Sequence, residues 1–211
     1  IASCLVGSEM CIRDRYSSRD ELWSALYNDC ADCNWVSVSG GGDPLWQWPH
    51  HQKWWAHFFD TCRKLGRQTE LHTSYYDVKN DPDIMLFPFE RFDRVVYHLH
   101  HMDELDKIHR VGGEIVRVVF VVDDNMTEDE INKIAEYVEY SNEVDELTFR
   151  QRVDEHYKET YHLHDFLLAG HQKRWWYVTQ CDYNTYFHNG KLYTKLSLIH
   201  ISEPTRQEAI S

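Results

Sequence analysis

The sequence predicts an α/β fold built on a parallel sheet. Short β-branched segments alternate along the chain with segments whose apolar residues recur at helical spacing. The clearest strand, Ile115–Val122, is almost continuously apolar, which is typical of strands buried on both faces of a parallel sheet. Such alternation indicates right-handed crossovers, and it places binding chemistry at the carboxyl ends of the strands.

Five strands are expected, each followed or preceded by helical sequence. They are Trp35–Ser39, Glu70–Ser74, Arg94–His98, Ile115–Val122 and Leu147–Arg150. The expected helices are Ser17–Cys30, His50–Leu65, Met102–Val111 and Asp124–Tyr140. In the last of these, Thr127 is placed to cap the helix, with Glu130 three residues later. Near the carboxyl end, Asn189-Gly190 between TYFH and KLYT predicts a short β-hairpin.

The two ends of the chain do not belong to this pattern. They read IASCLVGSEMCIRDR over residues 1–15 and LSLIHISEPTRQEAIS over residues 196–211. A DNA sequence that encodes the first segment has a reverse complement that encodes residues 196–210, and part of it resembles the transposon end of sequencing libraries. We therefore assign both ends to translated adapter and leave them out of the fold. We expect a barrel segment at 16–153 and a carboxyl-terminal extension with the hairpin at 154–195.

The composition argues against a nucleic-acid-binding protein and against a membrane protein. The net charge is −13, of which the two ends carry −1, and this acidic balance argues against broad binding to nucleic acid. No apolar run approaches the roughly 20 residues that span a bilayer, so no membrane partner is expected. Outside the ends, four cysteines without a secretory signal indicate a reducing compartment, and we expect a cytoplasmic protein. These cysteines are Cys30, Cys33, Cys62 and Cys181.

The segment with the most chemical content is NWVSVSGGGDPLW, residues 34–46. Glycines just past a strand let the backbone approach a ligand and expose N–H groups, and an adjacent carboxylate can bind an amine. The segment lacks the glycine spacing of a dinucleotide loop and the lysine of a phosphate loop. Taken alone, a tight strand-to-helix turn explains it equally well.

In its context, this segment resembles the Gly-Gly-acid-Pro strand end of the radical S-adenosylmethionine (SAM) superfamily. Residues 64–73 (KLGRQTELHT), 115–137 (IVRVVFVVDDNMTEDEINKIAEY) and 144–151 (VDELTFRQ) are similar to later strands of that family, in the same order. The resemblance covers Ser17–Val153. It implies a partial (β/α)6 barrel that binds SAM against a [4Fe-4S] cluster. Reduction by an electron donor would cleave SAM, and the resulting radical would abstract hydrogen from a small-molecule or peptide substrate.

The resemblance also implies site residues. Gly41, Gly42 and Asp43 would hold the methionyl amino group of SAM, and the adjoining Gly40 and Pro44 complete the turn. Polar residues at later strand ends would face the adenosyl portion or the substrate: His72, Ser74, His98 and His100. Arg150 would anchor a carboxylate or another part of the substrate. We expect Gly40–Pro44, His72, His98 and Arg150 to converge at one end of the sheet.

One departure concerns the cluster, which the family holds with Cys-x3-Cys-x2-Cys. Cys30 and Cys33 form a pair, but Leu26 occupies the third position and the pair follows the first helix. We reject them as ligands of that cluster; loop cysteines or an auxiliary iron–sulfur or zinc site remain open. We expect no cluster metal in this chain, no reductive SAM cleavage, and an open sheet edge where a first strand should pair.

Two other interpretations remain. Histidines at strand spacing, in His98-Leu-His100-His101 and His162-Leu-His164, suit a metal-dependent hydrolase or isomerase on a related barrel. Alternatively, the chain is a non-catalytic barrel that keeps a SAM-binding shape without a cluster. The substrate is not predicted by either the residues or the resemblance.

Overall fold

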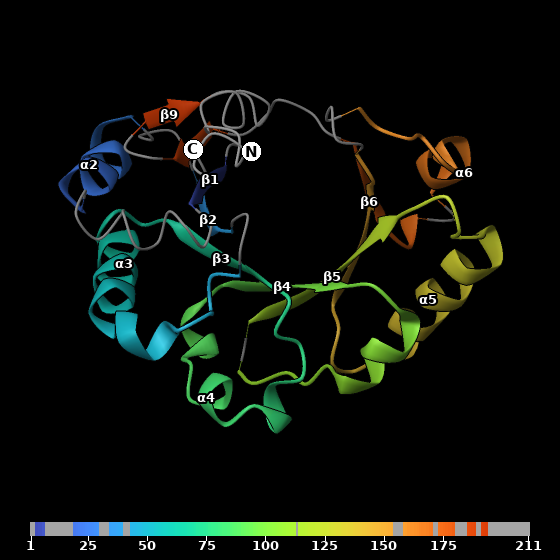
Figure 1. Cartoon of the computed structure of the whole chain (residues 1–211), viewed down its shortest axis with the longest axis horizontal. Coiled ribbons are helices and arrows are strands. Elements are labelled where there is room, and N and C mark those ends of the chain that lie inside the picture. The colour runs from blue at the N-terminus through green and yellow to red at the C-terminus, as the bar shows by residue number, and fades with distance from the viewer. Residues whose placement is uncertain are drawn as a thin grey trace, which may run out of the picture.

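The strands form one curled, mostly parallel sheet. The computed structural model describes residues 3–6, 19–29, 34–39, 43–112, 114–153, 158–170, 173–179, 185–188 and 191–193. Within them the strand order is β7-β6-β5-β4-β3-β2-β1-β8-β9, and each neighbouring pair is parallel except β8 and β9. Helices α2 to α6 cover the outer side of the curl (Figure 1). The α/β fold class and the partial barrel are confirmed.

All five expected strands are present, and further strands widen the sheet. The strands are β1 Ser3–Val6, β2 Trp35–Val38, β3 Gln68–Thr73, β4 Arg94–Leu99, β5 Ile115–Val122, β6 Glu146–Gln151, β7 Trp176–Val178, β8 Thr185–His188 and β9 Lys191–Tyr193. The predicted hairpin is confirmed, because β8 and β9 pair antiparallel. It is not a separate appendage, since β8 also pairs parallel with β1 inside the same sheet.

The expectation of an open edge beside β2 is wrong. Ser3–Val6, from the segment that we assign to adapter, pairs in parallel with Trp35–Val38 and lies between β2 and β8. The physical reason is that an edge strand offers unpaired N–H and C=O groups, and a short apolar segment satisfies them through its main chain. Pairing of this kind depends little on side chains, so it does not bear on the origin of the segment.

The helices are shorter than their periodic sequences. They are α2 Arg19–Ser24, continued by a π-helical turn at Ala25–Asp29, α3 Gln52–Lys64, α4 Pro82–Met85, α5 Glu128–Tyr140 and α6 His164–Ala169, with 3-10 turns at Trp48–His51, Val78–Asn80, Phe89–Arg91 and Met102–Lys107. The α-helix predicted at Met102–Val111 is therefore wrong. Glu104 accepts the backbone N–H groups of His100 and His101, so the segment winds as a tight 3-10 turn.

The caps of α3 and α5 agree with the sequence. The Thr127 hydroxyl accepts the backbone N–H of Glu130 at 3.2 Å, as the capping prediction requires. Gly66, which follows α3, has a φ of +63°, a conformation that favours glycine. None of the described helices is both long enough and apolar enough to cross a membrane.

The core lies between the outer face of the sheet and the helices. Alternate strand residues that point outward are fully buried, among them Leu71, Val95, Val118 and Phe149. The same buried cluster contains aromatic side chains from α3 and the loops after α4, which contact one another: Trp55, Phe58, Phe59, Phe87 and Phe92. Because helices cover only the outer face, the intervening strand residues are left on the concave face.

Candidate functional site

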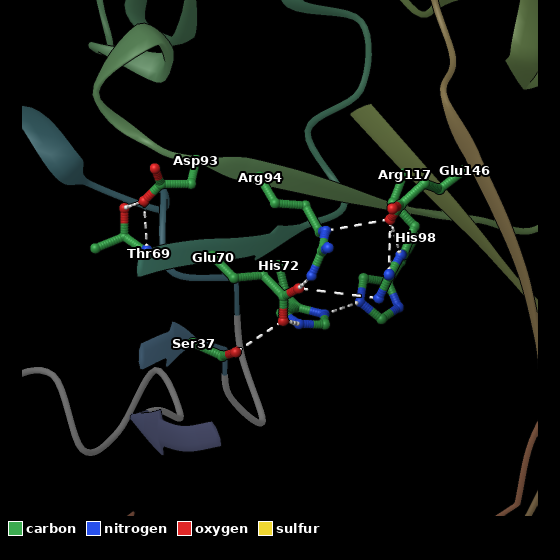
Figure 2. A network of polar contacts seen from close by, with 9 residues as sticks. All are labelled: Ser37, Thr69, Glu70, His72, Asp93, Arg94, His98, Arg117 and Glu146. Atoms are coloured by element: carbon green, nitrogen blue, oxygen red, sulfur yellow. Dashed lines mark hydrogen bonds and ion pairs between the residues drawn. The ribbon is translucent and has the colours of Figure 1, made fainter. Parts of the chain in front are cut away.

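The concave face of the sheet is polar. Strand register places Ser37 opposite Glu70 and Glu70 opposite Arg94. It likewise places Arg117 opposite Glu146. Charged side chains thus come from β3, β4, β5 and β6 and point to one another across the strands (Figure 2). In a sheet whose other face is mostly apolar, such a concentration of charge marks this face as the candidate site.

Four of these residues form a continuous ionic network. Arg94 Nη1 donates to Glu70 Oε2 at 2.9 Å, and Arg94 Nε lies 3.1 Å from Glu146 Oε2. Arg117 Nε and Nη2 lie 2.7 and 2.6 Å from the same Glu146 oxygen. Each guanidinium also stacks on an indole, Arg94 on Trp35 at 4.2 Å and Arg117 on Trp176 at 5.0 Å.

Glu70 is the centre of this network. Its Oε1 accepts the hydroxyl of Ser37 at 2.7 Å and lies 2.8 Å from Nε2 of His72. Burial by itself raises the pKa of Glu70, but His72, Arg94 and Ser37 together outweigh burial and hold that pKa far below its usual range. Glu70 is therefore an ionised carboxylate with a donor on every side.

Two histidines continue from Glu70 toward the carboxyl ends of the strands. Nδ1 of His72 lies 3.0 Å from Nε2 of His98, which joins β3 to β4. Burial, with the nearby charges of His72, Arg150 and His100, lowers the pKa of His98 to about 3 against the opposing effect of Glu70. His98 is thus a neutral imidazole at neutral pH, able to donate at one nitrogen and accept at the other.

The Asp43 carboxylate links the ends of β2 and β3. It accepts the backbone N–H of Leu45 at 2.9 Å and the hydroxyl of Thr73 at 2.9 Å. It also accepts the backbone N–H of Ser74. Pro44 is buried within the turn that follows. The predicted glycines at 40–42 lie outside the described residues, so the exposed N–H groups expected of that turn stay a prediction.

Arg150 lies on the same face as His98, one strand beyond β5. Register pairs His98 with Val119, Val119 with Thr148, and Val121 with Arg150. Among the described residues, no side chain makes a hydrogen bond or ion pair with its guanidinium, in contrast to Arg94 and Arg117. Its charge is near enough to lower the pKa of His98. Arg150 is therefore a cation available to a ligand on this face.

The structure thus brings most, but not all, of the predicted site residues together. Asp43 binds the end of β3, and His72, His98 and Arg150 share the concave face. Two others are exposed at the strand ends, where they contribute backbone N–H groups: Ser74 to Asp43, and His100 to Glu104. Cys30 and Cys33 lie outside the described residues.

The histidine clusters do not form a metal centre in the described part of the chain. His162 contacts the carbonyl of Met126 at 2.8 Å, and His164 contacts the hydroxyl of Tyr177 at 2.9 Å. Among described residues, no three or more His, Cys, Asp or Glu side chains gather as ligands. The hydrolase or isomerase interpretation gains no support from these positions.

Sequence reasoning missed Glu70, Arg94, Arg117 and Glu146. A usable pattern was present, because polar residues occur at every second position of otherwise apolar strands, as in Glu70-Leu-His72. That spacing gives the shared face but not the partners, which depend on register between strands.

Comparison with known proteins finds the fold but no family. No protein family model matches the chain, and no curated protein matches it. The crystal structure of Streptococcus suis SuiB has a TM-score of 0.57 at 12% identity, and that of SuiB bound to S-adenosylmethionine has 0.56 at 13%. Each comparison covers 88% of this chain and 55% of SuiB, so the chain spans about half of its neighbour. By fold, this chain is therefore similar to a protein whose structure is known with S-adenosylmethionine bound.

Proposed function

We propose that this chain is a segment of a radical SAM enzyme, and that it binds SAM at the carboxyl ends of β2 and β3. The observation that carries the proposal is the Asp43 carboxylate, braced by Thr73 and Ser74 where the family resemblance puts the methionyl amino group. The fold shared with SuiB, whose structure is known with SAM bound, supports SAM binding as such.

The residues at the carboxyl ends of β2 and β3 fit the amino-acid portion of SAM. Donors from Leu45, Thr73 and Ser74 fix the orientation of the Asp43 carboxylate, so that little ordering is needed when an ammonium group binds. A carboxylate and an ammonium form a charge-assisted hydrogen bond, roughly twice as strong as a neutral one. The share of this chain in the reaction is then to bind and orient.

The residues of this chain do not fit the [4Fe-4S] cluster. The sequence contains no Cys-x3-Cys-x2-Cys. Cys62 is buried on α3, and burial raises its pKa to about 12, so it is a thiol rather than a thiolate ligand. In an enzyme of this family, reductive cleavage of SAM supplies the radical that abstracts a substrate hydrogen. We propose that cluster ligands are supplied from outside this chain, which by itself cleaves no SAM.

The lack of the triplet also favours a second candidate, a barrel that binds SAM without catalysis. A complete reading frame distinguishes the two. Cys-x3-Cys-x2-Cys ahead of the first helix would support the enzyme, and a full-length gene without it would support the binding protein.

The binding proposal is tested by calorimetric titration of the whole chain with SAM. Asp43→Asn removes the charge but keeps the size, and it should weaken SAM binding about 10- to 100-fold, the range for a hydrogen bond to a charged group. Asp81→Asn is the matched control, because Asp81 also accepts two backbone N–H groups but does so at the start of α4. No SAM binding by the unmodified chain, or equal affinities of the two variants, would contradict the proposal.

A further inference from the structure

Glu70, His72 and His98 form a line of hydrogen bonds whose chemistry the proposed function leaves unused. Glu70 Oε1 lies 2.8 Å from Nε2 of His72, and His72 Nδ1 lies 3.0 Å from Nε2 of His98. The line runs along β3 and crosses to β4, toward the carboxyl ends of both strands (Figure 2). A carboxylate followed by two imidazoles is a chain of groups that can pass protons.

The hydrogen-bond partners fix where most protons lie. Ser37 and Arg94 donate to Glu70, which as an ionised carboxylate accepts only. His72 must therefore carry a proton on Nε2, the nitrogen that faces Glu70. Between His72 Nδ1 and His98 Nε2 there is room for a single proton. When both imidazoles are neutral, that proton belongs to His98 Nε2, and His98 Nδ1 is an acceptor.

The surroundings favour an acceptor at that atom. No described residue makes a hydrogen bond to His98 Nδ1, and the side chain is only partly buried. The charged and titratable groups that face the histidine pair are Glu70 on β3, Arg94 on β4, His100 after it, Arg117 on β5, and Glu146 and Arg150 on β6. Arg94 and Arg117 are neutralised by Glu70 and Glu146, which leaves the charge of Arg150 for a ligand.

We propose that His98 is a general base on the concave face, that His72 and Glu70 are its positioning residues, and that its substrate is a protic group whose anion binds Arg150. In the forward step, the substrate X–H gives its proton to His98 Nδ1 and keeps the bonding electron pair. The proton on His98 Nε2 passes to His72 Nδ1, while His72 Nε2–H stays bonded to Glu70. The products are X⁻ beside Arg150 and an imidazolium at His72 paired with the Glu70 carboxylate, so charge is conserved.

This inference goes beyond the proposed function, and it does not depend on SAM or on a cluster. The test therefore uses the whole chain alone, with ¹⁵N-labelled histidine, and long-range ¹H–¹⁵N spectra that report which ring nitrogen is protonated. Near pH 8 we expect His98 protonated at Nε2 and bare at Nδ1, and His72 protonated at Nε2. On acidification, both rings should respond at one shared midpoint, because they share a proton.

Two variants distinguish the hydrogen-bonded relay of Glu70, His72 and His98 from the general electrostatic effect of a nearby negative charge. Glu70→Gln should lower the proton affinity of the histidine pair at least tenfold. Glu146→Gln makes the same charge change in the same ionic network without touching an imidazole, and it should lower that affinity less than threefold. Equal effects of the two variants, or His98 protonated at Nδ1 near pH 8, would overturn the relay. The tautomer of the unmodified chain decides the question even if Glu70→Gln does not fold.

Sodium acetate tests the anion half of the proposal. If an anion binds between Arg150 and His98, acetate should raise the proton affinity of the histidine pair, and this rise should vanish in Arg150→Gln. Arg152→Gln is the control, because Arg152 is an exposed arginine two residues further along the chain, and it should keep the acetate effect. No acetate effect in the unmodified chain, or the same effect in Arg150→Gln, would overturn it. A failure to bind SAM changes none of these readouts.

Discussion

Arg94→Met tests how far the concave ionic network stabilises the fold. Methionine keeps an unbranched stem of similar reach, so the substitution removes the guanidinium and little of the packing. Three contacts are lost: the hydrogen bond to Glu70 at 2.9 Å, the ion pair with Glu146 at 3.1 Å, and the stacking on Trp35. Two carboxylates then face each other with one guanidinium fewer between them.

The size of the effect follows from burial and from what remains. The side chains of Arg94, Glu70 and Glu146 are 15%, 10% and 15% exposed, so this is a mostly buried network rather than a surface pair. Breaking a buried pair from one side costs about 3–5 kcal/mol. Arg117 still neutralises Glu146, while Ser37 and His72 still donate to Glu70. We therefore expect the low end, a loss of about 3 kcal/mol in the free energy of unfolding.

Urea unfolding followed by tryptophan fluorescence measures this loss. With an m-value of about 2 kcal/mol/M, the midpoint should fall by roughly 1.5 M. Arg63→Met is the matched control, because the Arg63–Asp60 pair at 3.2 Å is 77% and 48% exposed, and its removal should change stability by less than about 1 kcal/mol. A loss below about 1 kcal/mol in Arg94→Met, or losses equal in both variants, would refute the reasoning.

Two further predictions concern pH and helix capping. The pKa of His98 is about 3 in the folded chain and roughly 6.5 when unfolded, so the unfolded state binds more protons between these values, and stability falls as pH drops below about 6.5. Urea titrations of His98→Gln should therefore show a loss of stability between pH 7 and pH 5 that is smaller by about 1–2 kcal/mol than in the unmodified chain. The lowered pKa of Glu70 does not contribute in this range, because Glu70 changes stability only below about pH 4.3. If the pH dependence of stability is the same in His98→Gln, His98 is not neutral in the folded chain. Thr127→Ala removes the 3.2 Å bond to the Glu130 N–H and should lower the urea-derived stability by about 1 kcal/mol; a loss under about 0.3 kcal/mol would show that this cap is dispensable.

The strands could be predicted from the sequence because a buried strand has a recognisable pattern of apolar residues within a few positions. Ile115–Val122 is apolar on both faces for most of its length, and the predicted strand matches the observed one in both bounds. The cap at Thr127 and the stop at Gly66 are likewise local, since each depends on neighbours within a few residues. The α-helix expected at Met102–Val111 is not observed, because a contact distant in sequence outweighs the local helix propensity. Glu104 also accepts the hydroxyl of Tyr76 at 2.8 Å.

The candidate site could be predicted only in part. His72, His98 and Arg150 were found as polar residues at strand ends, and their common face follows from the strand alternation. The ionic network was not found, because Glu70 and Arg94 are 24 residues apart and meet only once the register of β3 and β4 is set. Asp43 illustrates the same limit, since its partners Thr73 and Ser74 lie at and just after the end of another strand, β3.

The order of the strands also has a consequence for how the chain acquires its structure. From β2 to β6, each strand pairs with the one that precedes it in the sequence, so the sheet can grow outward by closing one short loop at a time. The entropy cost of closing a loop rises slowly with loop length, and burial of the outer face of each added strand offsets that cost as soon as the strand pairs. The pairing of β1 with β8 joins Val6 to Phe187 and is the one long closure among the described strands. We expect it to form last, on a sheet whose polar concave face is already assembled.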